Sequence, residues 1–152
     1  MSKGLRVFGH PLHAILSDLP AALLGTSLLW DGLGLWRGES VWWAISFWTI
    51  SAGLAFAVLA ALAGMIDFAA IPEKHPAQST ATRHMLLMMS ALAPYCFSLL
   101  VRHGPAPPAG KALAGALALE ALGVLLLSLG GWYGGHLVFH YGIGHDGGDV
   151  EK

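Results

Sequence analysis

The residues best suited to chemistry in this sequence are its histidines, which number eight in 152 residues. Neutral imidazole is the commonest side-chain metal ligand, and one or two histidines on facing helices can hold a haem iron. His13, His84 and His136 each lie a few residues inside one end of a long apolar run, and Asp67 lies near the end of another. If these runs are membrane helices in alternating directions, the four side chains fall at a similar depth on one side. The spacing therefore predicts a ligand-binding layer.

A b-type haem is the ligand that we expect in this layer. Its iron would take two imidazoles as axial ligands, and His13 and His84 are the predicted pair, with His136 able to replace either. His10 and Asp67 would lie behind them and hydrogen-bond an imidazole or a propionate, which would fix the orientation of the ligand ring.

Basic and small residues near the layer complete the predicted haem site. Arg83 or Arg6 would pair with a propionate near the membrane interface. Glycines in the last apolar run offer flat walls for the macrocycle, and they are Gly130, Gly131, Gly134 and Gly135. The same glycines form two interleaved small-xxx-small pairs, a pattern typical of close helix packing in membranes, and both interpretations are compatible.

Two alternatives to haem stay open at this point. A single transition-metal ion could be bound by His13, His84 and His136 together with Asp67, since imidazole and carboxylate suit zinc, iron or copper. The sequence has no H-E-x-x-H motif to support that site. In the other alternative no cofactor binds, the histidines hydrogen-bond water, headgroups or backbone carbonyls, and the chain is a structural subunit of a larger membrane complex.

The elements that must position these residues are transmembrane helices. Hydrophobic residues make up 55% of the chain, charged residues 11%, and the mean hydropathy is +0.62. Crossing the bilayer core takes about 20 apolar residues in a helix. Four runs meet this length, separated by Pro- and Gly-rich breaks, and they cover residues 12–36, 41–71, 82–101 and 112–141. The prediction is an all-α, integral membrane, up-down-up-down four-helix bundle that forms one domain over residues 1–152.

Charges favour one orientation in the membrane and exclude one class of partner. Five Lys and Arg residues fall on the side of the termini and three on the other side, which favours cytoplasmic termini. Inside the runs, Asp31 and Glu120 lie toward the opposite side as buried charges and hint at a polar path. A net charge of −1 with no basic stretch argues against nucleic-acid binding.

The sequence also resembles a known bacterial family of four-helix membrane proteins that is defined as a domain of unknown function. The first matching motif is Gly9-His10-Pro11-Leu12-His13, followed by Asp18-Leu19-Pro20. Weaker matches follow at residues 52–54, 64–67 and 81–84. The last motif is Gly131-Trp132-Tyr133-Gly134-Gly135-His136-Leu137-Val138.

This resemblance implies membrane electron transfer, because relatives are sometimes fused to Rieske or cytochrome c domains. It maps the motif histidines onto His10, His13, His84 and His136, whereas relatives differ at His140. The 152 residues contain no such redox domain, so a separate membrane or redox protein or the quinone pool is the expected electron partner. The resemblance also implies a multi-pass protein of the bacterial inner membrane, an electron-transfer subunit rather than a stand-alone enzyme, and is compatible with an oligomer.

Overall fold

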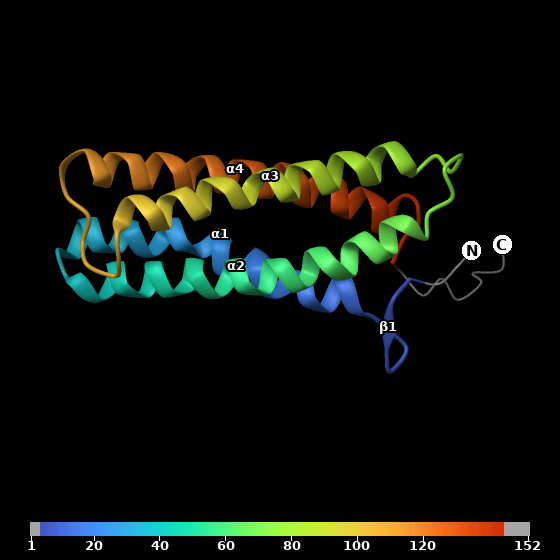
Figure 1. The fold of residues 1–152 in the computed structure, drawn as a ribbon, viewed down its shortest axis with the longest axis horizontal. Helices are drawn as coiled ribbons and strands as arrows, with labels where there is room; N and C mark the ends of the chain where they lie inside the picture. The colour runs from blue at the N-terminus through green and yellow to red at the C-terminus, as the bar shows by residue number, and fades with distance from the viewer. Residues whose placement is uncertain (1–3, 145–152) are drawn as a thin grey trace.

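A computed structural model describes residues 4–144 of the chain. Within that range there are four long helices, α1 (Leu12–Arg37), α2 (Ser40–Ala69), α3 (Gln78–Arg102) and α4 (Gly110–Phe139). A two-stranded antiparallel hairpin, β1 (Arg6–Val7) and β2 (His10–Pro11), precedes α1. The helices alternate in direction, so β1, the α2–α3 connection and the end of α4 lie at the same end of the bundle (Figure 1). The predicted all-α four-helix architecture is confirmed.

All four helices are long and apolar enough to cross a membrane. Their outward surface carries exposed large hydrophobic side chains along its length, such as Leu29, Trp48, Phe97 and Leu125. The interior is rich in alanine, glycine and serine, and it also contains a few large side chains, such as Leu24 and Tyr95, and three charged ones. Apolar residues outside and small or polar residues inside are the distribution expected of a bundle surrounded by lipid.

The helix bounds differ from the predicted ones by up to four residues. The largest difference is in α3, which begins at Gln78 rather than at residue 82. Apolar runs mark the part of a helix that lies in hydrocarbon, whereas the helix itself continues into the interface until its backbone is interrupted. At the end of α1 that interruption is Gly38, whose φ of 69° is left-handed and whose N–H bonds to the Gly34 carbonyl.

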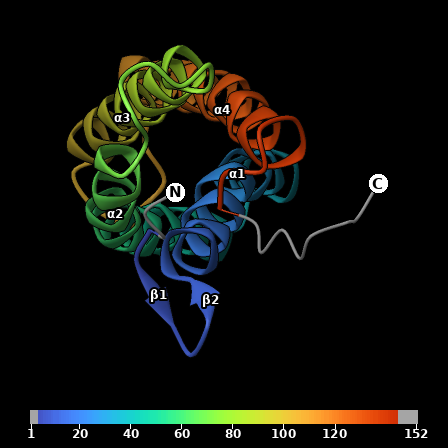
Figure 2. The ribbon, with the colours of Figure 1, turned by 90° about the vertical axis from the view of Figure 1, so that its right-hand side faces the viewer.

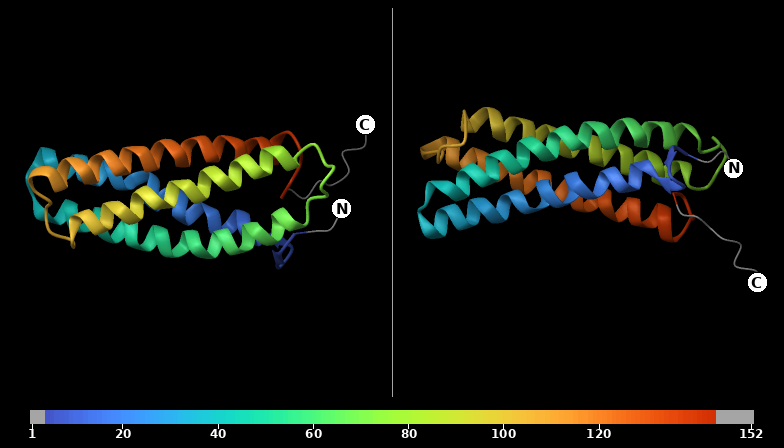
Figure 3. Two further views of the ribbon diagram at one scale, coloured as in Figure 1. Left: turned by 45° about the horizontal axis from the view of Figure 1, so that its top comes forward. Right: turned by 90° about the horizontal axis from the view of Figure 1, so that it is seen from below.

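The four helices pack as two hairpins. Helix α1 lies along α2, and α3 lies along α4, while contacts between the two hairpins, through α1–α4 and α2–α3, are much less extensive. Viewed down the bundle, the helices follow one another around a ring, so α1 stands diagonally opposite α3 (Figure 2). Figure 3 shows from two further directions that the four long helices run along the same bundle axis.

The hairpins repeat the same burial pattern. Each of four buried positions in α1 has a buried counterpart in α3 71 residues later, at 20 and 91, 24 and 95, 27 and 98, and 31 and 102. Five buried positions of α2 recur in α4 70 residues later, at 46 and 116, 50 and 120, 53 and 123, 57 and 127, and 60 and 130. This equivalence indicates an approximate twofold axis along the bundle, with the hairpins as parallel repeats. Sequence reasoning missed the repeat because few equivalent residues are identical.

Glycines permit the close approach of the helices within each hairpin. A Cβ on Gly123 would stand 2.7 Å from the ring of Tyr95, and one on its counterpart Gly53 would stand 2.7 Å from Leu24 Cδ2. Both Tyr95 and Leu24 are fully buried, so neither side chain has room to yield.

Gly123→Ala should therefore destabilise the bundle by about 1–3 kcal/mol, the usual cost of overpacking a core. The matched control is Gly131→Ala on the same helix, where an added Cβ meets nothing within 4 Å and where stability should stay unchanged. Thermal unfolding in detergent measures the difference. Equal midpoints for the two variants would contradict the packing described here.

Candidate functional site

The histidine layer is built around two imidazoles that meet across the bundle. His13 at the start of α1 and His84 near the start of α3 approach to 6.3 Å between ring centroids, with their ring planes at 78° to one another. Both side chains are partly buried. They occupy equivalent positions in the two hairpins, 71 residues apart, so the approximate twofold axis passes between them. The structure therefore brings these two side chains close together across the bundle.

Each imidazole is held by the second helix of its own hairpin. His13 Nδ1 lies 2.8 Å from the Ala60 carbonyl oxygen, and His84 Nδ1 lies 2.8 Å from the Gly130 carbonyl oxygen. Since a carbonyl can only accept a hydrogen bond, Nδ1 carries the proton in both rings, and the lone pair of each neutral ring is on Nε2. Both imidazoles are therefore set in the tautomer that binds a metal through Nε2.

A glycine one turn beyond each carbonyl makes room for the ring. A Cβ on Gly64 would stand 2.8 Å from His13 Cε1, and a Cβ on Gly134 would stand 2.9 Å from His84 Cε1. Each imidazole therefore packs against the helix backbone at a glycine, in the space that a Cβ would occupy. Gly64 and the two carbonyls were not among the predicted site residues, and the spacing of 71 and 70 residues between equivalent groups was the signal that could have identified them.

His136 does not join this pair. Its ring is exposed and stacks on His140 at 4.6 Å, and Tyr141 stands edge-on to both rings. The reason is helical geometry, because His136 follows Gly134 by two residues and so points about 200° away from the face that meets His84. His136 was predicted to lie in this layer because its depth in the membrane is similar to that of His13 and His84. Its side chain, however, points away from them around the helix.

Asp67 has a different partner from the one expected. One of its carboxylate oxygens accepts a hydrogen bond of 2.8 Å from the backbone N–H of Leu5. The side chain also lies directly against Gly4, where a Cβ would be 2.3 Å from its Oδ1. Asp67 therefore holds the segment before β1 on the end of α2. His10, in β2, is exposed and pairs with Val7 in the hairpin.

The remaining predicted residues lie around the layer rather than in it. Arg83 is exposed, with its guanidinium 5.9 Å from the ring centroid of Tyr133. Gly131 is exposed, and a Cβ on Gly135 would meet only Phe139, at 3.9 Å. Of the glycines expected to form walls, only Gly130 and Gly134 face the interior.

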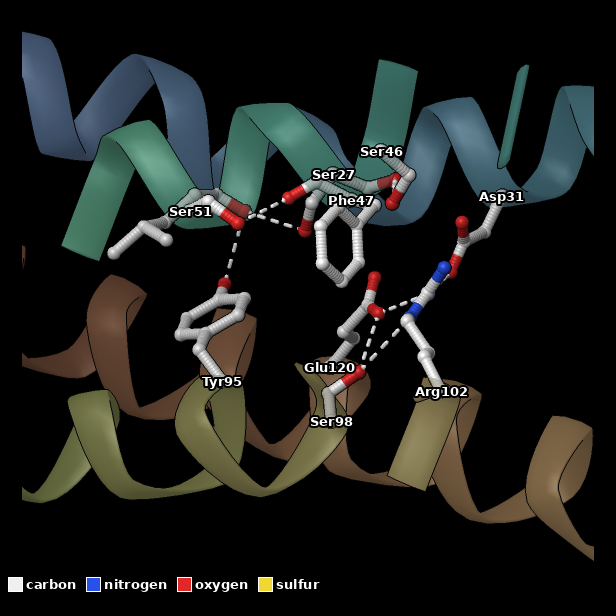
Figure 4. A network of polar contacts seen from close by, with 10 residues as sticks. Ser27, Asp31, Ser46, Phe47, Ser51, Tyr95, Ser98, Arg102 and Glu120 are labelled. Carbon is white, nitrogen blue, oxygen red and sulfur yellow. Dashed lines mark hydrogen bonds and ion pairs between the residues drawn. The ribbon is translucent and has the colours of Figure 1, made fainter. Parts of the chain in front are cut away.

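A second polar group lies in the other half of the bundle. Arg102, the last residue of α3, donates from Nη2 to both Asp31 Oδ2 of α1 and Glu120 Oε1 of α4. Ser98 joins them, accepting from Arg102 Nε at 3.2 Å and donating to Glu120 Oε1 at 2.8 Å. The three charged side chains are at most 1% exposed and point toward one another in the interior (Figure 4). Asp31 and Glu120 were singled out in the sequence, but Arg102 was placed in the connection because the predicted helix ended at residue 101.

Arg102→Met should destabilise the protein strongly, by about 3–5 kcal/mol, because it removes the counter-charge from two fully buried carboxyl groups. Arg37→Met is the matched control, since Arg37 pairs with Glu39 at 3.1 Å on the exposed end of the bundle and such pairs contribute about 0–1 kcal/mol. Urea or thermal unfolding in detergent compares the two. Similar losses in both variants would show that the buried cluster does not stabilise the fold.

Comparison with known proteins identifies a family of predicted membrane proteins. No curated protein and no solved structure is detectably similar to it. Residues 9–147, which include all four helices and both imidazoles of the pair, match the family described as "Predicted membrane protein (DUF2231)". The chain therefore belongs to the DUF2231 family of membrane proteins.

Proposed function

We propose that this protein is a membrane b-type haem protein that relays electrons, with the haem held between His13 and His84. The observation that carries the proposal is the distance between the two rings. Metal–imidazole bonds of about 2.0–2.1 Å place the centroids of two imidazoles on opposite sides of one metal roughly 6 Å apart. The centroids of His13 and His84 are 6.3 Å apart, so the pair has the spacing of two axial ligands.

The protonation state of the rings supports the same assignment. In metal-binding histidines the second ring nitrogen is almost always hydrogen-bonded, which fixes the tautomer and the ring orientation. Here the Ala60 and Gly130 carbonyls perform that task for His13 and His84. The glycines at 64 and 134 leave room for the two rings, so the imidazoles are held in equivalent orientations on the two hairpins.

The donor set favours haem over a bare metal ion. Among residues 4–144, no three His, Cys, Asp or Glu side chains lie close enough together to hold a metal ion. Two imidazoles alone leave a transition metal without the rest of its ligands, whereas a porphyrin brings four nitrogens of its own. Contacts between the hairpins are less extensive than those within them, and His13 and His84 come from different hairpins, so a group held by both would lie between the two halves of the bundle.

When bound, the haem would supply a one-electron carrier that alternates between ferric and ferrous iron. The chain's own residues would set its properties. The two Nδ1–carbonyl bonds orient the imidazoles, and the exposed Arg83 beside His84 would pair with a propionate. His10 also stays a candidate to hydrogen-bond a propionate.

The proposed setting is the bacterial inner membrane, with both termini on the cytoplasmic side. The electron donor and acceptor would be separate membrane or redox proteins, or quinone in the bilayer. The protein would then act as an electron-transfer subunit rather than as a stand-alone enzyme.

The absorption spectrum of the detergent-purified protein, oxidised and then reduced with dithionite, tests the proposal. We expect a Soret band together with sharp α and β bands after reduction, and we expect His13→Ala and His84→Ala each to abolish them. His140→Ala is the control, since it removes an exposed imidazole from the same end and should leave the spectrum intact. If protein supplied with haem during expression shows no Soret band, the chain is a cofactor-free structural subunit or a metal-binding protein instead.

Gly134→Ala should weaken haem binding without removing a ligand. Its Cβ would press on His84 at 2.9 Å and turn the imidazole away from its carbonyl partner, and changes behind a metal ligand typically cost about 10–100-fold in affinity. Gly135→Ala, one residue further on, meets only an ordinary contact and serves as the control. Haem titration of the apoprotein measures both, and equal affinities would argue against His84 as a ligand.

A further inference from the structure

We propose that the cluster of Asp31, Arg102 and Glu120 is a proton-binding site, in which the two carboxyl groups share one exchangeable proton. This inference does not use the histidine pair and is independent of haem binding. It follows from the charge balance of the cluster, from two unsatisfied oxygens and from the place of the cluster in the bundle.

The charge balance leaves one negative charge in excess. One guanidinium faces two carboxyl groups, and all three side chains are at most 1% exposed. The polar groups of the cluster come from three helices. Helix α1 contributes Asp31, α3 contributes Arg102 and Ser98, and α4 contributes Glu120, whereas the only ionisable residue of α2 is Asp67 at the opposite end. The other basic residues of the helices at this end, Arg37 and Lys111, are exposed, and Arg37 pairs with Glu39.

An uncompensated charge at this depth is expensive. An isolated carboxylate in the apolar interior of a membrane protein is strongly unfavourable, and a buried carboxyl group avoids this cost when it binds a proton. With one carboxyl group neutral, the other is balanced by Arg102 and the cluster carries no net charge. The ion pair and the neutral acid can then coexist in the bundle interior.

Two oxygen atoms mark where the proton is held. Asp31 Oδ1 and Glu120 Oε2 are buried and, within the described residues, have no hydrogen-bond partner, while the second oxygen of each group is bonded to Arg102. A protonated carboxyl group becomes a donor, and the unpartnered oxygens are the places left for that proton. A proton on either oxygen would leave in place the contact that Arg102 makes with the other oxygen of the same carboxyl group.

The cluster is also close enough to one membrane surface to exchange its proton with water. Arg102 ends α3, and the exposed His103 follows it directly. Asp31 lies six residues before the end of α1, which is about 9 Å along the helix. The Trp43 ring, 5.8 Å from the Arg102 guanidinium, covers the cluster on the side of α2. The site therefore faces the α3–α4 connection, on the opposite side from the histidines.

Infrared spectroscopy of the protein in lipid nanodiscs tests the proposal. A protonated carboxyl group absorbs at higher frequency than any carboxylate or amide, and its band shifts to lower frequency in D₂O. We expect one such band at neutral pH. It should disappear in Asp31→Asn and also in Glu120→Gln, because either change leaves one carboxylate balanced by one arginine. Glu39→Gln, which alters an exposed carboxyl group, should keep it.

Two outcomes of the infrared experiment would overturn the proposal. One is the absence of the band in the folded native protein, which would mean that both carboxylates are ionised. The other is loss of the band on adding sodium or potassium chloride at constant ionic strength, which would make the cluster a metal-cation site.

Unfolding midpoints provide a second, independent readout. Asp31→Asn and Glu120→Gln should each keep a midpoint close to the native one, whereas the double variant should fall sharply because it leaves Arg102 buried without a counter-charge. Single variants as unstable as the double variant would contradict the shared proton.

Discussion

Hydrocarbon outside the bundle is the constraint on which the rest of this structure depends. A polar group in the interior of four membrane helices cannot hydrogen-bond to water, so its partners must come from the other helices. The two polar sites meet this requirement in different ways. At one end, imidazoles donate to backbone carbonyls of a neighbouring helix, and at the other end charged side chains neutralise one another. Both sites are assembled from helices of different hairpins, which ties the two halves together.

The approximate twofold axis explains why the two sites lie where they do. Equivalent positions of the two hairpins face each other near the axis, so a residue at one position meets its counterpart from the other hairpin. At positions 13 and 84 the counterparts are identical, and the result is a symmetric pair of imidazoles. At positions 31 and 102 the counterparts have opposite charges, and the result is an ion pair. The symmetric imidazole pair suits a ligand that lies on the axis, whereas the ion pair, whose two members differ in charge, does not.

Much of this could be predicted from the sequence, because the bilayer imposes a length and a polarity on each helix. The four helices follow from the apolar runs, and the similar depth of His13 and His84 follows from their positions within those runs. Depth does not give direction around the helix, which is why His136 was expected in the layer although it points away.

The partners of the imidazoles are backbone carbonyls, which have no signature in composition. Asp67 was misjudged for a related reason, since its partner is the backbone of Leu5. Arg102 was missed because a charge at the end of an apolar run was taken as the end of the helix.

The symmetry also separates residues that are conspicuous in sequence from residues that build the site. Gly131 and Gly135 stand in the densest motif of the chain, yet neither faces the interior pair. Gly64 stands in a plainer stretch, and it seats His13 as closely as Gly134 seats His84. The repeated contacts, rather than the motif, identify which glycines the imidazoles require.

We propose that His13 and His84 would together hold one haem iron, and electron paramagnetic resonance of the oxidised protein distinguishes this from the alternatives. Two imidazole ligands produce low-spin ferric haem, and ring planes as close to perpendicular as 78° should give the strongly anisotropic form of its signal. We predict that signal in the native protein. A high-spin signal, which indicates a single axial histidine, or no haem signal from protein supplied with haem would contradict the account.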